Sequence, residues 1–108
     1  MSAEFHDYIV YDVLGHIPHI TSRRMFGGYG IYHEDIIFAI IAEDELYFKV
    51  ANNNRAQYEK HESKPFTYRG HKDRKPTVMS YWLVPEEITN DAELIEQWLF
   101  GAKEAHNK

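Results

Sequence analysis

The chain has 108 residues, of which 44% are hydrophobic and 27% are charged, a balance that suits one folded domain and argues against intrinsic disorder. Its formal net charge of −5 argues against a protein that binds the phosphate backbone of nucleic acid over its whole surface. The lack of cysteine excludes disulfides and Cys-based zinc sites. No apolar stretch approaches the roughly 20 residues of a membrane span, and residues 1–10 lack the pattern of a signal peptide. We therefore expect a cytoplasmic protein without a membrane partner.

Residues 3–14 predict the first helix. Phe5, Ile9 and Val13 recur every four residues, which places their side chains on one helix face. Gly15 and Pro18 follow, and they predict that the helix ends there.

Three short apolar segments come next, at residues 25–33, 36–42 and 45–50. Glu34-Asp35 and Glu43-Asp44 lie at the two joints between them. Segments of this length, rich in β-branched and aromatic residues and joined so closely, predict an antiparallel meander.

If these joints are two-residue turns, the pairing register is fixed and side chains can be assigned to the two faces of the sheet. The face suited to lie beneath helices, with glycines allowing close approach, would carry Gly28, Gly30, Tyr32, Ile37, Ala39, Ile41, Leu46, Phe48 and Val50. The opposite face would carry a second, largely apolar set: Tyr29, Ile31, Phe38, Ile40, Tyr47 and Lys49. A few helices do not readily cover both faces, so the second set predicts an interaction surface for a protein partner or a second copy. The alternative is that a helix or the C-terminal tail covers it.

The remaining elements are a short helix from Asn52 to His61, an extended segment at residues 66–69, a strand at residues 77–84 and a final helix. Asn90 and Glu93 are spaced as in a capping box, which predicts where the final helix begins. Together these elements predict an α+β fold in two layers, with an antiparallel sheet of about five strands and about three helices.

The candidate catalytic and metal-binding motifs are weak. The glycine-rich run at residues 26–30 has no following helix or lysine, which favours strand bending or close packing over a phosphate loop. His16 and His19 straddle Pro18 without a neighbouring carboxylate motif, which favours exposed histidines over a metal site. Ser80 lies within a predicted strand and lacks the sharp turn of a hydrolase nucleophile. We expect no catalytic residue, no metal and no cofactor.

Six basic residues suggest an alternative function. Two of them precede the first predicted strand, and the other four bracket the loop before the strand at residues 77–84. If these two segments adjoin, they form a local positive patch for nucleic acid or an acidic protein: Arg23, Arg24, Arg69, Lys72, Arg74 and Lys75. The alternative interpretation is a solvated loop in which one arginine closes a salt bridge.

Several blocks in a specific order and spacing resemble the N-terminal domain family of the TfoX/Sxy competence regulators. The blocks are residues 23–32, 38–39, 46–50, 65–68, 79–82 and 85–87, and the resemblance spans residues 21–105. Its signature positions are Arg24, Met25, Phe26, Gly27, Gly28, Tyr81 and Trp82. The resemblance implies helices packed on an antiparallel sheet, similar in outline to type III secretion chaperones. It also implies a bacterial, cytoplasmic regulator of natural competence and of genes controlled with the cyclic-AMP receptor protein.

The chain departs from the family pattern in two respects. Two-domain members add a C-terminal helical domain, so we expect here a single TfoX N-terminal-type domain over residues 1–108 without that second part. Family members tend to have glycine where Glu62 stands, and a left-handed helix cap disfavours other residues, so we expect the middle helix to end differently.

The family offers no established catalytic residues to transfer. The resemblance and the apolar second face together predict a non-catalytic regulatory domain that binds a protein partner, with the transcription machinery as one candidate and a homodimer as another. Nucleic-acid binding through the basic residues is the alternative. A small-molecule binder or enzyme is the third class, and it would need a pocket lined by Tyr29, Tyr68 and Trp82 with a convergent polar group.

Overall fold

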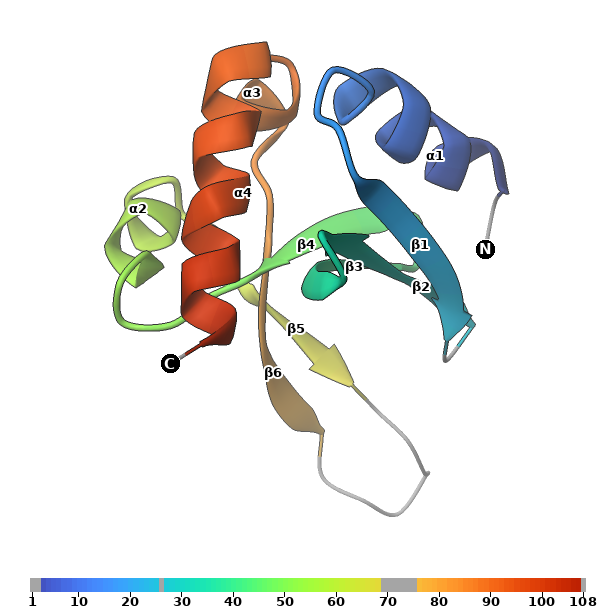
Figure 1. The fold of residues 1–108 in the computed structure, drawn as a ribbon. Coiled ribbons are helices and arrows are strands. Elements are labelled where there is room, and N and C mark those ends of the chain that lie inside the picture. The colour runs from blue at the N-terminus through green and yellow to red at the C-terminus, as the bar shows by residue number, and fades with distance from the viewer. Residues whose placement is uncertain (1–2, 26, 69–75, 108) are drawn as a thin grey trace.

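The helices gather on one side of an open six-stranded sheet (Figure 1). A computed structural model describes residues 3–25, 27–68 and 76–107. The strands are β1 (Ile20–Met25), β2 (Gly28–His33), β3 (Ile36–Ala42), β4 (Glu45–Lys49), β5 (Pro65–Tyr68) and β6 (Thr77–Leu83). All neighbours are antiparallel, in the order β1-β2-β3-β4-β6-β5. The helices are α1 (Ala3–Asp7), the π-helix η1 (Tyr8–Val13), α2 (Arg55–Lys60), α3 (Glu86–Thr89) and α4 (Ala92–His106). The α+β class is confirmed, with one strand more than expected.

The predicted N-terminal helix forms, but its second half is wider than an α-helix. The Leu14 N–H donates to the Ile9 carbonyl at 2.9 Å, an i→i+5 bond. A Cβ at position 15 would lie 2.0 Å from the Tyr11 carbonyl oxygen, so the chain can leave this helix as it does only because Gly15 has no side chain.

The strand that was not predicted is β1. Arg23 and Arg24 were expected to precede the sheet, whereas they lie inside β1 and pair with Gly30 and Tyr29. Its polar sequence reflects its position at the edge of the sheet, where both side-chain directions reach solvent. Gly27 then turns the chain into β2 with φ of +76°.

Both predicted two-residue turns are confirmed. Glu34, Asp35, Glu43 and Asp44 have φ values of 52°, 67°, 53° and 57°, as in hairpin turns of type I′. A β-bulge follows the first turn, because Tyr32 pairs with Ile37 whereas Ile31 pairs with Ala39. Phe38 is therefore an extra residue in β3, and it reverses the alternation of side chains along the rest of the strand.

The bulge makes the predicted faces wrong for β2 and for the start of β3. Ile31 and Phe38, expected on the uncovered face, are fully buried with Ala39 and Phe48. Conversely, four residues expected beneath the helices face away from them: Gly28, Gly30, Tyr32 and Ile37. Five residues do lie on the helix-covered face as predicted: Ala39, Ile41, Leu46, Phe48 and Val50.

The helix-covered face forms the core around α4. The Phe38 and Phe48 rings meet edge to face at 5.3 Å, and α4 buries Ile95, Leu99 and Ala102 over this face. The cap of α4 is Asp91, whose carboxylate accepts from the N–H groups of Glu93 and Leu94, both at 3.0 Å. The predicted cap at Asn90 is therefore wrong by one residue.

The end of α2 also differs from the prediction. Glu62 adopts the left-handed conformation with φ of 60°. Its N–H donates to the Glu59 carbonyl at 2.9 Å, and the Ser63 N–H donates to the Tyr58 carbonyl at 3.0 Å. These two bonds are those of a Schellman motif, so α2 ends in the glycine-type cap despite carrying glutamate there.

Candidate functional site

The face of the sheet opposite the helices, called the open face below, carries a row of partly exposed apolar and aromatic side chains. Strand alternation and cross-strand pairing place residues from every strand on it. They are Arg23 and Met25 from β1, Tyr32 from β2, Ile37 and Ile40 from β3, Tyr47 and Lys49 from β4, Phe66 and Tyr68 from β5, and Met79 and Tyr81 from β6. None of these eleven side chains is fully buried.

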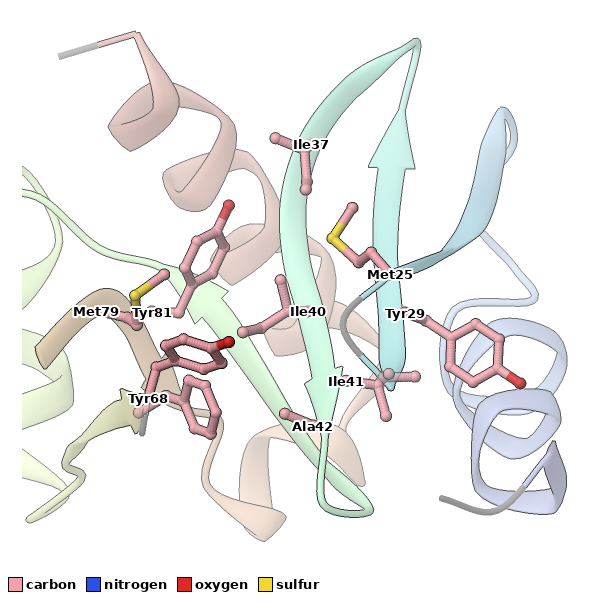
Figure 2. Close-up of a pocket in the computed structure, with 11 residues that line it drawn as sticks. Met25, Tyr29, Ile37, Ile40, Ile41, Ala42, Tyr68, Met79 and Tyr81 are labelled. Atoms are coloured by element: carbon pink, nitrogen blue, oxygen red, sulfur yellow. The ribbon is translucent and has the colours of Figure 1, made fainter. Parts of the chain in front are cut away.

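A hollow of about 300 Å³ lies in the middle of the open face and is called the trough. Figure 2 shows Met25 on one side of it, Ile40 near its centre, and Tyr68, Met79 and Tyr81 on the other side. Gly30 makes room for this arrangement, since a Cβ there would lie 2.6 Å from the terminal methyl of Met25.

The two ends of the open face carry opposite charge. At one end, the cationic end, Lys49 Nζ lies 5.1 Å from the centre of the Tyr81 ring and Arg23 Cζ lies 5.4 Å from the centre of the Tyr32 ring. Burial and the neighbouring Tyr32 raise the pKa of Tyr81, so these two rings share one environment although they come from β2 and β6.

At the other end, the acidic end, the β3–β4 turn brings carboxylates toward Tyr47. Burial is the main cause that raises the pKa of Tyr47, and the charges of Glu45 and Glu43 raise it further. The Tyr47 ring packs against Phe66, with ring centres 5.0 Å apart.

The residues on which the resemblance rests have both structural and surface positions. A Cβ on Gly28 would lie 2.0 Å from the Ile41 carbonyl oxygen, so glycine lets β2 pass β3 closely. Met25 and Tyr81 line the trough, whereas Trp82 points to the opposite side of β6 and lies near Tyr58, with ring centres 6.3 Å apart. Arg24 Cζ lies 5.9 Å from the centre of the Tyr29 ring. Phe26 falls outside the described residues.

The family model of the TfoX N-terminal domain matches residues 12–106, which include all six strands and α4. The chain belongs to the TfoX N-terminal domain family. The resemblance inferred from the sequence blocks is thereby confirmed. No curated protein is similar enough to the chain to count as a match.

In this TfoX N-terminal domain, the six predicted interaction residues do not share one surface. Ile40, Tyr47 and Lys49 lie on the open face as predicted. Ile31 and Phe38 lie in the core. The Tyr29 ring turns toward the N-terminal helix (Figure 2) and packs against His6, with ring centres 4.2 Å apart and ring planes tilted by 34°.

Although Met25 and Tyr81 were named as signature positions, sequence reasoning did not place five of the trough residues on this surface. They are Met25, Ile37, Phe66, Met79 and Tyr81. The period-two spacing of Phe66 with Tyr68, and of Met79 with Tyr81, was the available signal. Of the three residues named for a hypothetical ligand pocket, Tyr29 and Tyr68 line the trough, whereas Trp82 does not.

The predicted basic patch is not assembled by the described part of this domain. Arg23 and Arg24 are consecutive in a strand, so their side chains point to opposite faces of the sheet. Four other predicted members lie outside the described residues: Arg69, Lys72, Arg74 and Lys75.

A partly buried polar contact lies on the helix-covered side. The Lys103 ammonium donates to Glu34 Oε1 at 2.9 Å and lies 2.8 Å from His33 Nδ1. Burial, and secondly the charge of Lys103, lower the pKa of His33, so this ring is held neutral and accepts from the lysine. The contact joins the β2–β3 turn to α4 and has a structural role.

A second polar cluster ties the N-terminal helix to β1. His6 lies 2.8 Å from Ser22 Oγ and 2.8 Å from Asp7 Oδ1. This Asp–His–Ser order resembles that of hydrolases, but the Asp7 side chain is 61% exposed and does not provide the buried carboxylate that orients such a histidine. Across residues 3–25, 27–68 and 76–107, no three histidine or carboxylate side chains gather as a metal site would need. None of the helices within these ranges is long and apolar enough to cross a membrane.

Proposed function

We propose that this chain is a non-catalytic domain of the competence-regulator type that binds a protein partner through its open face. The observation that carries the proposal is the exposed apolar surface contributed by every strand of the sheet. Contiguous apolar surface of this kind is uncommon on monomers and usually marks an association site.

The chemistry of the face supports a protein partner. Tyrosine gives large contact area at small entropic cost, and methionine adapts its shape to different neighbours. The surface offers four tyrosines and two methionines: Tyr32, Tyr47, Tyr68 and Tyr81, with Met25 and Met79.

The hollow shape of the trough favours a convex partner over a second copy of the same face. Two hollow surfaces placed against each other would enclose unfilled space, which forfeits packing contacts. A ridge of apolar side chains, such as one face of an amphipathic helix, would fill it. We therefore propose that the partner is a different protein, with the transcription machinery as the first candidate.

The test is capture of partners from extracts of the native cell by three forms of the chain: wild type, Tyr47→Asp and Tyr11→Asp. Tyr11 is 67% exposed on η1, so its substitution introduces the same charge away from the open face. We expect Tyr47→Asp to lose the captured protein and Tyr11→Asp to keep it, with both variants retaining the wild-type Tm.

The salt dependence of capture separates the two functional classes. Apolar docking survives an increase in salt, whereas binding to a nucleic acid through Arg23, Arg24 and the basic residues at positions 69–75 weakens steeply with salt. Equal capture by all three forms, or capture that disappears on nuclease treatment, would contradict docking through the open face.

A further inference from the structure

We propose that the trough also binds a compact anionic amphiphile, with an aromatic or aliphatic body in the hollow and a carboxylate, sulfonate or phosphate group at the cationic end. This binding goes beyond the proposed docking, because it needs no protein partner and uses charges that apolar docking does not require.

The size of the hollow sets the size of the ligand. At about 300 Å³ it lies at the lower end of small-molecule sites, which span roughly 300–1,000 Å³. A two-ring aromatic or a chain of medium length would fill this space. Met25 and Met79 line opposite sides of the hollow (Figure 2). Because methionine side chains are flexible, these two walls can adapt to the shape of a ligand.

The cationic end supplies the polar recognition that such a pocket needs. Arg23 and Lys49 each lie against a tyrosine ring, and within the described residues neither forms an ion pair with a carboxylate. Their charges are therefore available to an anion. The hydroxyl groups of Tyr32 and Tyr81 can add hydrogen-bond donors beside them.

The cationic end adjoins the hollow. Tyr81 lines it directly, and Tyr32 pairs across the strands with Ile37, which also lines it. An anionic group at this end would thus lie beside an apolar body in the hollow. The carboxylates of Glu43 and Glu45 belong to the opposite end, next to Tyr47.

Two fluorescent probes test the proposal on the purified chain. The first is 1-anilinonaphthalene-8-sulfonate, and the second is N-phenyl-1-naphthylamine, which has the same ring system without the sulfonate. We expect the sulfonate to bind at least about tenfold more tightly than the neutral probe, and decanoate to displace it where decanol does not.

Charge-removing variants locate the anion. The double variant Arg23→Gln, Lys49→Gln should weaken binding of the sulfonate probe about tenfold and leave the neutral probe unchanged. The matched control is Arg55→Gln, Lys60→Gln, which removes two charges from α2 and should change neither affinity. Ile40→Glu should weaken both probes, because it places a charge in the hollow.

Equal affinities for the two probes, or equal effects of the two double variants, would overturn the proposal, as would absence of sulfonate binding. Such a result would leave protein docking intact, because partner capture is measured without either probe.

Discussion

Phe48 and Tyr47 are neighbours in β4, yet their side chains have different roles. The Phe48 side chain is fully buried against Phe38 beneath α4, whereas the Tyr47 side chain remains partly exposed beside Phe66. The same contrast holds along the central strands β3 and β4, where α4 covers the face that supplies the core and the other face remains open. The comparison teaches that apolar content alone does not identify the core of this domain, because both faces are apolar.

The largest expected effect contrasts the two faces within β3. Phe38→Ala should lower the free energy of unfolding by about 3–5 kcal/mol, because it opens a cavity in the covered face. Ile40→Ala should lower it by only about 1 kcal/mol, since Ile40 is already partly in water. Urea denaturation measures both. Equal losses would mean that the open face is part of the core.

Two glycine-to-alanine substitutions should change stability in opposite directions, because the backbone around the two positions differs. Gly28→Ala should destabilise by about 1–3 kcal/mol, because the new methyl group would meet the Ile41 carbonyl oxygen at 2.0 Å. Gly101→Ala should instead raise the free energy of unfolding by about 0.5–1 kcal/mol. Position 101 lies within α4, and a Cβ added there would meet its nearest neighbour, the Asn54 side chain, at 3.7 Å. Thermal unfolding distinguishes the signs, and a stabilised Gly28→Ala would contradict the close passage of β2 and β3.

Glu62 provides a smaller effect, on the helix-covered side. Glu62→Gly should stabilise the chain by about 0.5–1 kcal/mol, because glycine adopts the left-handed cap of α2 without steric cost. Glu62→Ala is the matched control, since it removes the charge and keeps a Cβ. If both variants gained the same stability, the charge and not the backbone conformation would be the cause.

The smallest expected effect is a dependence of stability on pH through His33. Because the pKa of His33 is lowered in the folded chain, the unfolded state binds a proton more readily below pH of about 6.5. Stability should therefore fall as the pH falls from about 6.5 toward the folded-state pKa of His33, and become constant again below it. Urea midpoints measured across this range for wild type and His33→Gln isolate the effect. If the urea midpoint of His33→Gln depended on pH as strongly as that of wild type, a group other than His33 would be the cause.

The sequence predicted much of the fold because its turns are well marked. Glu34-Asp35 and Glu43-Asp44 interrupt apolar segments and fixed the hairpins correctly. The bulge at Phe38 could not be predicted, because residues 36–42 are all apolar and their alternation carries no information about the faces. Similarly, β1 escaped detection because an edge strand can be polar on both sides.

The candidate site was predicted in part for the same reason. Ile40, Tyr47 and Lys49 follow from the β3–β4 turn, which is local in sequence. Met79 and Tyr81 join them only because β6 pairs with β4 across an intervening helix and strand. That long-range pairing has no short sequence signal, so the trough became visible only in three dimensions.

The central claim, that the open face remains accessible once the chain has folded, can be measured without any partner. A neutral gadolinium chelate broadens the NMR signals of methyl groups that it can approach from solvent. In the isoleucine methyl spectrum of the purified chain, Ile37 and Ile40 should broaden strongly, while the signals of Ile9, Ile31 and Ile95 should stay sharp. Sharp signals from Ile37 and Ile40 would contradict the account, because they would mean that this surface is already occupied.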